Sequence, residues 1–458
     1  MPPVDQPTPG HTLTFLVVLY ALAGLVNLGI AVAIGRRRAN RRKATISGPA
    51  TPGSAAAGPA LGRLVIPAVA SAIFSILALA AGLGYPLGLP LWLRDGIDAA
   101  CNPLTLYLAA LVTLIVAWYA RRWLVRPMVG LTFLNLAIIW LGASLLDPDF
   151  AAEVGRPDNV AVVGMLLLMA GCLWAAAHSA VENDRRLTVH QPPVEAEDNQ
   201  RVLVWPDLVA IELVATLLIG AGLIAWSLLL AAPLEGPANP AVTPNPAKAP
   251  WYFLGLQELL VFADAWNAGV MVPLLAVVGL MLLPYLDVNP RGSGYYTMAE
   301  RRFAVTVFLL GFFLLGVLPI VVGTFLRGPN WVFYGPYETR DPYRLAEALN
   351  VSLAEYFWTF GLGVELPRVD AVGGWHRVAR LLYRELPGLI LLVLYFIALP
   401  VVLRYTALKE WRRRMGGWRF AVMMFLLLWM ASLPLKMVLR WTFQLSYIVH
   451  LPEWSLSF

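Results

Sequence analysis

The sequence predicts an all-α polytopic membrane protein, because it is strongly apolar and because its apolar stretches recur at bilayer-spanning length. Of its 458 residues, 59% are hydrophobic and only 14% are charged, whereas an ordinary soluble domain carries about 25% charged residues. A helix needs about 20 residues to cross the hydrocarbon core of a bilayer. These properties exclude a soluble globular domain and favour a bundle of about ten transmembrane helices.

The expected spans follow one another along the whole chain. They lie near Leu13–Ile34, Leu64–Gly84, Leu104–Ala120, Met128–Leu146, Val160–Ala180, Leu208–Leu230, Ala268–Leu286, Phe303–Phe325, Leu386–Leu403 and Phe420–Leu435. One further segment, Leu345–Gly361, is rich in aromatic residues but interrupted by polar ones. We expect it to be a helix that lies on the membrane surface.

The basic residues predict the orientation of these spans, since short cytoplasmic loops accumulate Lys and Arg. If the N-terminus is outside, the inner loops contain about two thirds of the 34 basic residues, including the clusters at 36–43 and 412–414. Most of the others lie in one long loop between Phe325 and Leu386, and long loops are weak topology signals. We therefore expect both termini on the outer, periplasmic side of a bacterial inner membrane. The net charge of +6 then reflects orientation and anionic lipid contact, with no nucleic-acid partner.

The chain divides into three expected modules. Residues 1–203 form a five-span module that carries no recognisable motif. Its apolar faces are unbroken by buried charge, which argues against an ion path and favours packing against partner subunits. Residues 204–327 form a three-span module, and residues 328–458 form a long outer loop followed by two spans.

The loop between the sixth and seventh spans is the segment most suited to chemistry. Five prolines between Pro237 and Pro250 exclude a regular helix there, and Trp251, Tyr252 and Phe253 follow directly. Such a rigid, aromatic loop is suited to walling an apolar pocket at the membrane surface. The alternative is that these aromatic residues only anchor the chain at the membrane interface.

The order of residues in this loop distinguishes the two alternatives. The run Asn-Pro-Ala…Thr-Pro…Lys-x-x-Trp-Tyr-Phe resembles the loop between the first two helices of the cytochrome b C-terminal domain, called subunit IV in split complexes. Three flanking motifs are also similar to this family, and the resemblance covers Val204–Arg327. The flanking motifs are Trp205-Pro206-Asp207, Pro284–Asn289 and Arg301–Leu309.

The resemblance implies a role in quinol oxidation. In that family the loop helps form the quinol-oxidising pocket on the positive side of the membrane. Quinol gives one electron to a Rieske [2Fe-2S] centre and the other to a b haem, and both protons leave on the outer side. The implied quinol-binding residues are Pro250, Trp251, Tyr252 and Phe253. The implied partners are a dihaem cytochrome b chain, a Rieske iron–sulfur protein and a c-type cytochrome, in an assembly that can be dimeric.

One departure from the family concerns the proton acceptor. The family's Pro-Glu-Trp-Tyr is here Ala249-Pro250-Trp251-Tyr252, so that a proline replaces the glutamate that usually accepts a proton. We expect Glu258, about two helical turns further on, to be the substitute acceptor. Tyr252 would be a hydrogen-bonding wall of the pocket. The alternative is that Glu258 is a solvated surface acid. Asp264 is a weaker candidate, expected to be a loop or cap residue.

The histidines predict that the haems lie on another chain. A dihaem cytochrome b needs two histidines on each of two facing helices, and no predicted span here contains two. The five histidines are His11, His178, His190, His376 and His450. Only His178 falls inside a span, where an interfacial role is favoured over ligation. The two cysteines, Cys101 and Cys172, have no metal-ligand spacing. We therefore expect no haem, c-type haem, iron–sulfur centre or metal ion on this chain alone.

Together these features predict a subunit of a cytochrome bc-type quinol:electron-acceptor oxidoreductase, which is active only within its complex. The first alternative is a scaffold that lost the site with the glutamate and now only anchors extrinsic cytochromes. The second alternative is a transporter unrelated to quinones. Transporters tend to show internal repeats and intramembrane charges, and neither is evident in this sequence.

Overall fold

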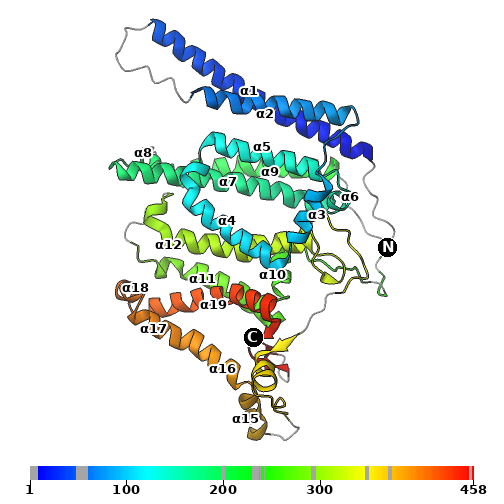
Figure 1. Ribbon diagram of the computed structural model, residues 1–458. Coiled ribbons are helices and arrows are strands. Elements are labelled where there is room, and N and C mark those ends of the chain that lie inside the picture. Colours follow the sequence, from blue (N-terminus) through cyan, green and yellow to red (C-terminus); the bar gives the residue numbers. More distant parts are fainter. Residues whose placement is uncertain are drawn as a thin grey trace.

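The computed structural model describes residues 9–47, 60–197, 202–229, 237, 239–241, 243–289, 296–345, 350–369, 374–452 and 456–457. Within these residues, ten helices are long and apolar enough to cross a membrane. They run side by side through the molecule (Figure 1). Their bounds are Thr12–Asn40, Arg63–Gly82, Pro103–Leu124, Pro127–Ser144, Pro157–Thr188, Val204–Leu229, Asn267–Leu286, Met298–Leu326, Leu386–Tyr405 and Gly417–Phe443.

The first five spans and their connections form the N-terminal part of the bundle. Its elements are α1 (Pro9–Ser47), α2 (Ala60–Gly82), α3 (Leu91–Ala100), α4 (Pro103–Leu124), α5 (Pro127–Ser144), α6 (Pro148–Val154), α7 (Pro157–Thr188) and α8 (Val194–Glu197). Proline is the first residue of α4, α5, α6 and α7, where its missing N–H costs no hydrogen bond.

The middle part contains three spans, several of them interrupted by π-helical turns. Its elements are η1 (Val204–Leu208), α9 (Val209–Leu229), α10 (Trp251–Leu259), η2 (Asn267–Met271), α11 (Val272–Leu286), α12 (Met298–Leu309), η3 (Leu310–Val317), α13 (Leu318–Val321), η4 (Val322–Leu326) and η5 (Pro329–Trp331). The π-helical turns η3 and η4 flank α13, so that α12 to η4 form one continuous span.

The C-terminal part adds two spans and four short strands. Its elements are β1 (Val351–Ser352), α14 (Leu353–Glu355), η6 (Tyr356–Gly361), α15 (Trp375–Arg384), α16 (Leu386–Val393), η7 (Leu394–Ala398), α17 (Leu399–Tyr405), α18 (Lys409–Met415), α19 (Gly417–Phe443), β2 (Leu445–Tyr447), β3 (His450–Leu451) and β4 (Leu456–Ser457). Strand β1 pairs in parallel with β2, and β3 pairs antiparallel with β4.

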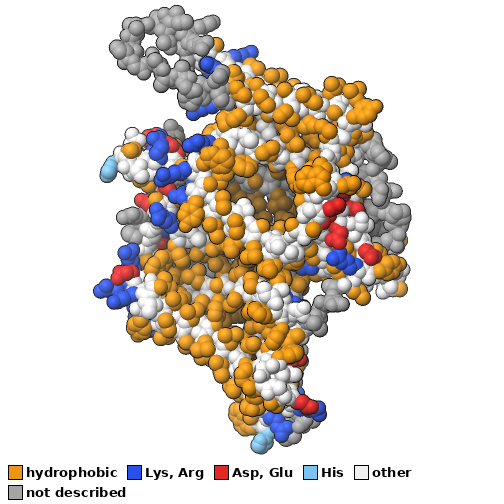
Figure 2. Space-filling model, viewed as in Figure 1, with side chains coloured by type: hydrophobic (Ala, Val, Ile, Leu, Met, Phe, Trp, Pro, Cys, Tyr) orange, Lys and Arg blue, Asp and Glu red, His pale blue; other side chains and the backbone are white. Residues whose placement is uncertain are grey.

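The surface has an apolar middle and charged ends, as a membrane-spanning bundle requires (Figure 2). We call the end that holds α3, α6, α10 and residues 326–345 the loop end, on the right in Figure 1. The opposite end, which holds α8 and α18, is called the basic end, because α18 ends in Arg412, Arg413 and Arg414. Charged side chains gather at both ends in Figure 2.

All ten predicted spans are present, and the two shortest predictions are extended in the structure. The third begins one residue earlier because Asn102 and Thr105 form a reciprocal N-terminal cap, with Asn102 Oδ1 accepting from the Thr105 amide at 3.0 Å. The tenth continues to Phe443, past Lys436 and Arg440. Arg440 reaches polar groups at the loop end, where its Nη2 donates to Asn350 Oδ1 at 2.8 Å.

The predicted surface helix is shorter than expected, and its predicted start at Leu345 is wrong. The helix occupies Leu353–Gly361, because Ser352 and Glu355 form a capping box that fixes its first turn. Residues 346–349 lie outside the described residues. Trp358 is buried and donates from Nε1 to the Arg384 carbonyl at 2.9 Å, so this helix packs on the C-terminal part.

One apolar core cluster joins all three parts of the chain. It contains Tyr107 of α4, Leu259 of α10, Leu314 of η3, Met437 of α19 and the residues Phe262, Ala263 and Ala268 that follow α10. By contrast, α9 buries none of its residues. Within the described chain, α9 is therefore a span whose surface is left for lipid or another subunit.

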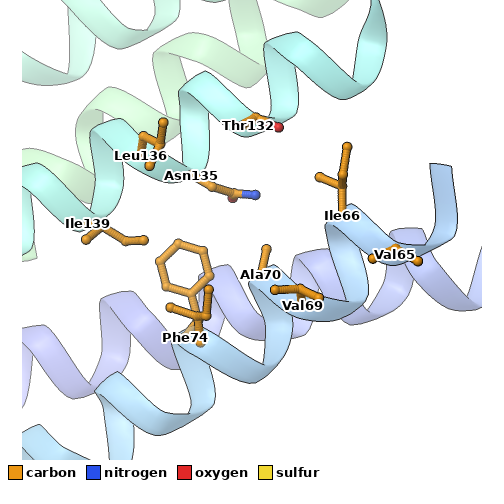
Figure 3. A pocket seen from close by; sticks show the side chains of 10 residues that line it. Val65, Ile66, Val69, Ala70, Phe74, Thr132, Asn135, Leu136 and Ile139 are labelled. Carbon is orange, nitrogen blue, oxygen red and sulfur yellow. The ribbon is translucent and has the colours of Figure 1, made fainter. Parts of the chain in front are cut away.

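An apolar groove separates the α1–α2 hairpin from α5, towards the basic end (Figure 3). Its cavity volume is about 290 Å³, and its walls carry Val65, Ile66, Val69, Ala70, Ile73, Phe74, Thr132, Asn135, Leu136 and Ile139. The Asn135 amide is already paired with Asn27, at 2.9 and 3.0 Å. No lining side chain is charged, so the groove offers no acid–base group.

Candidate functional site

The loop with five prolines between Pro237 and Pro250, called the Pro-rich loop, leads directly into α10 at the loop end of the bundle. Pro250 is the N-cap residue of α10, so the helix begins at Trp251, as soon as the prolines end. Gly255 lets α10 lie close to the end of the eighth span, because a Cβ there would be 3.1 Å from Ile320 Cγ1. This close approach places Glu258 beside Arg327, the residue that directly follows that span.

Glu258 and Arg327 form a buried, two-point ion pair. Arg327 Nε donates to Glu258 Oε2 at 2.9 Å, and Nη2 donates to Oε1 at 2.5 Å. The Glu258 residue is 3% exposed and Arg327 is 7% exposed. The Trp331 side chain also hydrogen-bonds to this carboxylate, and Arg327 Nη1 donates to the Trp331 carbonyl at 2.9 Å. Burial raises the pKa of Glu258 above its ordinary value, and the hydrogen bonds from Arg327 oppose that rise.

Hydrogen bonds hold the Pro-rich loop against two elements. Gln257 of α10 bonds to the loop backbone, and the Asn330 amide of η5 bonds to a loop side chain. Gln257 Oε1 accepts from the Ala249 amide and its Nε2 donates to the Ala247 carbonyl, both at 2.8 Å. Asn245 Oδ1 accepts from the Asn330 amide at 2.6 Å. These bonds replace the regular backbone pairing that the prolines prevent, and they hold the loop in one conformation.

Lys248 is the charged member of the loop, and its side chain points into the protein. Its Nζ donates to the Thr324 carbonyl at 2.7 Å and to Glu153 Oε1 at 3.1 Å. Burial lowers the pKa of Lys248 from its ordinary value, and the nearby Glu153 carboxylate opposes that decrease. The ammonium group therefore serves as an internal tie between three segments that are distant in the sequence.

The three aromatic side chains at the start of α10, called the aromatic triplet, are exposed, whereas Glu258 and Arg327 are buried. Trp251, Tyr252 and Phe253 are 40%, 57% and 53% exposed. The Tyr252 ring packs edge-to-face on Trp251 and is tilted against Phe253, with ring centroids 5.6 Å and 4.8 Å away. Together with Pro250 these rings form a continuous apolar surface that a flat ligand, a lipid or a partner protein can contact.

The alternative interpretation of Glu258 as a solvated acid is wrong, because Glu258 is buried and paired. Asp264 lies in the loop after α10, and its carbonyl accepts from the Ala268 amide at 2.9 Å, as expected for a residue preceding a helix. The sequence did not reveal Arg327, Gln257 or Glu153 as parts of the site. Arg327 and Glu153 are distant from the loop motif in the sequence, and Gln257 is not one of the motif residues. Only the packing of the chain brings these three residues to the loop.

Lys436 is a further charged residue that the sequence interpretation missed. It lies within the tenth span, where a charged side chain is costly, and Asp264 is the acid whose charge acts on it. Its neighbour Met437 belongs to the core cluster that also contains Leu259 of α10. The C-terminal spans thus contribute a cation beside the segment that carries Glu258.

The histidines whose side chains are described lie on separate elements. They are His178 on α7, His190 in the turn after α7, His376 on α15 and His450 on β3. His178 Nδ1 lies 3.1 Å from the Val125 carbonyl, and its ring stacks on Trp174 at 5.5 Å. Within this described set, no two histidines face each other from neighbouring spans, so these residues do not fit a haem held by two histidines of this chain.

Comparisons with known proteins identify the segment that contains the loop. Residues 237–327 match the family model described as Cytochrome b(C-terminal)/b6/petD. Cytochrome b of Acanthamoeba castellanii is 28% identical over 135 residues, which are 30% of this chain and 30% of that protein. The similarity thus spans under a third of that relative's length.

No solved structure matches the chain. The family match begins at Pro237, so that the predicted entry motif Trp205-Pro206-Asp207 lies before it, and it ends at Arg327, the partner of Glu258. The matched segment therefore contains the Pro-rich loop, the aromatic triplet and the buried ion pair. This multi-pass membrane protein contains a segment, residues 237–327, that is similar to the cytochrome b C-terminal/b6/petD family.

Proposed function

We propose that this chain is a membrane subunit of a cytochrome bc-type quinol:electron-acceptor oxidoreductase, and that its loop end contributes the quinol-oxidation site. The observation that carries this proposal is that the family-matched segment presents an exposed aromatic surface, Trp251–Phe253. This surface lies at the start of α10, directly after a loop that Gln257 holds by hydrogen bonds. A rigid apolar wall suits a flat, apolar quinol ring, because little order is lost on binding.

The proposed orientation puts the loop end on the positive, periplasmic side of a bacterial inner membrane. The Arg residues of α18 at the opposite end support this orientation, since cytoplasmic loops accumulate basic residues. Protons released by quinol would then leave on the outer side. The partner subunits in this proposal are a dihaem cytochrome b chain, a Rieske iron–sulfur protein and a c-type cytochrome.

Glu258 is the proposed proton acceptor and Tyr252 the proposed hydrogen-bonding wall. Both Glu258 oxygens accept from Arg327, so a proton taken up by the carboxylate removes its negative charge and weakens this ion pair. Arg327 stays anchored by its bond to the Trp331 carbonyl. The raised pKa of Glu258 favours proton acceptance at higher pH than an exposed glutamate would allow.

The test uses the complex purified in mild detergent, with quinol oxidation followed as reduction of a c-type cytochrome. Trp251→Ala is expected to raise KM for quinol roughly tenfold, since stacking on an aromatic ring contributes about 1 kcal/mol or more. Trp375→Ala is the matched control, because Trp375 is an 80% exposed tryptophan on α15 outside the proposed site. The proposal is contradicted if both variants oxidise quinol with the same kinetics as the unaltered complex.

The scaffold alternative is favoured by one observation, namely that Arg327 already occupies both oxygens of Glu258. A scaffold needs Glu258 only for folding, so Glu258→Gln would leave the rate of quinol oxidation unchanged in any complex that still assembles. An acceptor role requires that rate to fall by about two to four orders of magnitude, the usual contribution of general acid–base catalysis.

A further inference from the structure

The contacts that hold the Pro-rich loop extend beyond the family-matched segment. Two cations lie at the end of the eighth span, where helix carbonyls lack partners within the helix. Lys248 donates to the Thr324 carbonyl at 2.7 Å, and Arg340 Nη2 donates to the Phe325 carbonyl at 2.6 Å. Cations are favoured at the C-terminal end of a helix dipole. They also repel each other, and the charge of Arg340 helps lower the pKa of Lys248.

The countercharge between these cations comes from the N-terminal part of the chain. Glu153 on α6 places Oε1 3.1 Å from Lys248 Nζ and Oε2 3.6 Å from Arg340 Nε. Glu153 is 8% exposed, so water screens these charges poorly. Asn159 fixes the backbone at this position, since its Nδ2 donates to the Glu153 carbonyl at 2.7 Å. One carboxylate thus balances two partly buried cations, whose side chains are 17% and 15% exposed.

The same part of the chain also binds the segment that carries Arg340. The Asp98 carboxylate accepts from the Tyr337 amide at 3.0 Å, and Ser144 Oγ lies 2.8 Å from the Tyr337 hydroxyl. The Tyr337 ring stacks on Phe150 with centroids 5.4 Å apart. Three elements of the N-terminal part, α3, α5 and α6, therefore contact Tyr337, which lies three residues before Arg340.

We propose that Glu153 is the positioning residue for the Pro-rich loop, and that the N-terminal five-span part serves to complete the outer wall of the site. Glu153 acts through Lys248, which is three residues before Trp251, and it does not touch the proposed quinol itself. Its loss leaves Lys248 and Arg340 as two neighbouring, partly buried cations without this countercharge. Their repulsion is relieved when Lys248 and the loop move out into water. The positioning role in quinol oxidation rests on the proposed function, whereas the attachment of the loop does not.

The test compares Glu153→Gln with Asp158→Asn in the purified complex. Both variants neutralise an acid near the start of α7, but the ion pair of Asp158 among the described residues is with exposed Arg156, at 3.8 Å. The first readout is amide hydrogen exchange over residues 239–253. We expect exchange there to rise roughly tenfold or more in Glu153→Gln and to stay unchanged in Asp158→Asn. The second readout is the KM for quinol, expected to rise while kcat changes little.

The two readouts separate the inference from the function on which it rests. Faster loop exchange with a raised KM supports both. Faster loop exchange with unchanged quinol kinetics keeps the attachment and overturns the quinol role of the loop. Loop exchange that is unchanged in Glu153→Gln overturns the attachment, whatever the kinetics. If Glu153→Gln does not assemble, the same exchange measurement is made on Glu153→Asp and Lys248→Met. The expected rise in exchange is smaller for Glu153→Asp, because that variant keeps the negative charge.

Discussion

At the scale of single residues, the buried pair of Glu258 and Arg327 is expected to contribute strongly to stability. We expect Glu258→Ala to reduce the free energy of unfolding by about 3–5 kcal/mol, because it leaves the Arg327 guanidinium buried without its carboxylate. The measurement is unfolding of the purified chain or complex in mixed micelles.

The matched control for this variant is Glu365→Ala. Glu365 pairs with Arg368, but both side chains are more than four-fifths exposed. Its removal is expected to change the stability by less than about 0.5 kcal/mol. Similar losses of stability in the two variants would show that the Glu258 pair is no stronger than a surface pair.

The pH dependence of quinol oxidation tests the acceptor role of the same residue. An acceptor must be ionised before it takes a proton, so the rate falls as the pH is lowered through its pKa. Because burial raises the pKa of Glu258, we expect this acid limb to lie above the ordinary glutamate value of 4.5. Glu258→Gln should lose the limb and Glu365→Gln should keep it. A limb that persists in Glu258→Gln must belong to another group.

At the scale of elements, the Pro-rich loop depends on α10 for its conformation. Prolines fix the local backbone but remove amide donors, so the loop relies on Gln257, whose side chain binds both the Ala249 amide and the Ala247 carbonyl. We expect Gln257→Ala to cost about 1–3 kcal/mol locally and to speed proteolytic cleavage between residues 239 and 250.

Gln191→Ala is the control for the loop measurement. Gln191 lies exposed in the turn after α7, towards the basic end. Its replacement should leave the cleavage rate of the Pro-rich loop unchanged. If Gln257→Ala also leaves that rate unchanged, the prolines alone are sufficient to hold the loop.

At the scale of the whole molecule, the separate placement of the described histidines predicts that haem reaches the complex through another chain. We expect the chain produced alone to show no b-type haem absorbance. The complex purified from native membranes should show b-type absorbance, with a dihaem cytochrome b and a Rieske or c-type protein identified by mass spectrometry. Stoichiometric haem b on the isolated chain would contradict the first expectation, and native material without redox partners would contradict the proposed function.

The apolar core cluster connects the three parts of the whole molecule. Tyr107, Leu314 and Met437 come from the three expected modules, yet they pack together around Leu259. The three-part division thus remains a prediction about sequence organisation, while packing couples the parts at the loop end. The unburied span α9 is the surface where another subunit has most room to pack.

The sequence by itself determined the class of the protein, the ten spans and the family that the central segment resembles. These properties are local, because span length, hydropathy and motif order are each properties of consecutive residues. The span ends were less well determined, since Lys436 and Arg440 lower the local hydropathy although the helix continues through them.

Only the tertiary structure decided the surroundings of the predicted site. Glu258 was identified from its place in the sequence, but its burial and its partner depend on a contact across 69 residues. The link from Lys248 to Glu153 spans 95 residues and crosses from the motif to a part of the chain without any motif. Ion pairs between residues so far apart give no periodic pattern in the sequence. The packing of helix ends at the membrane surface determines these pairs, and neighbouring residues in the sequence do not.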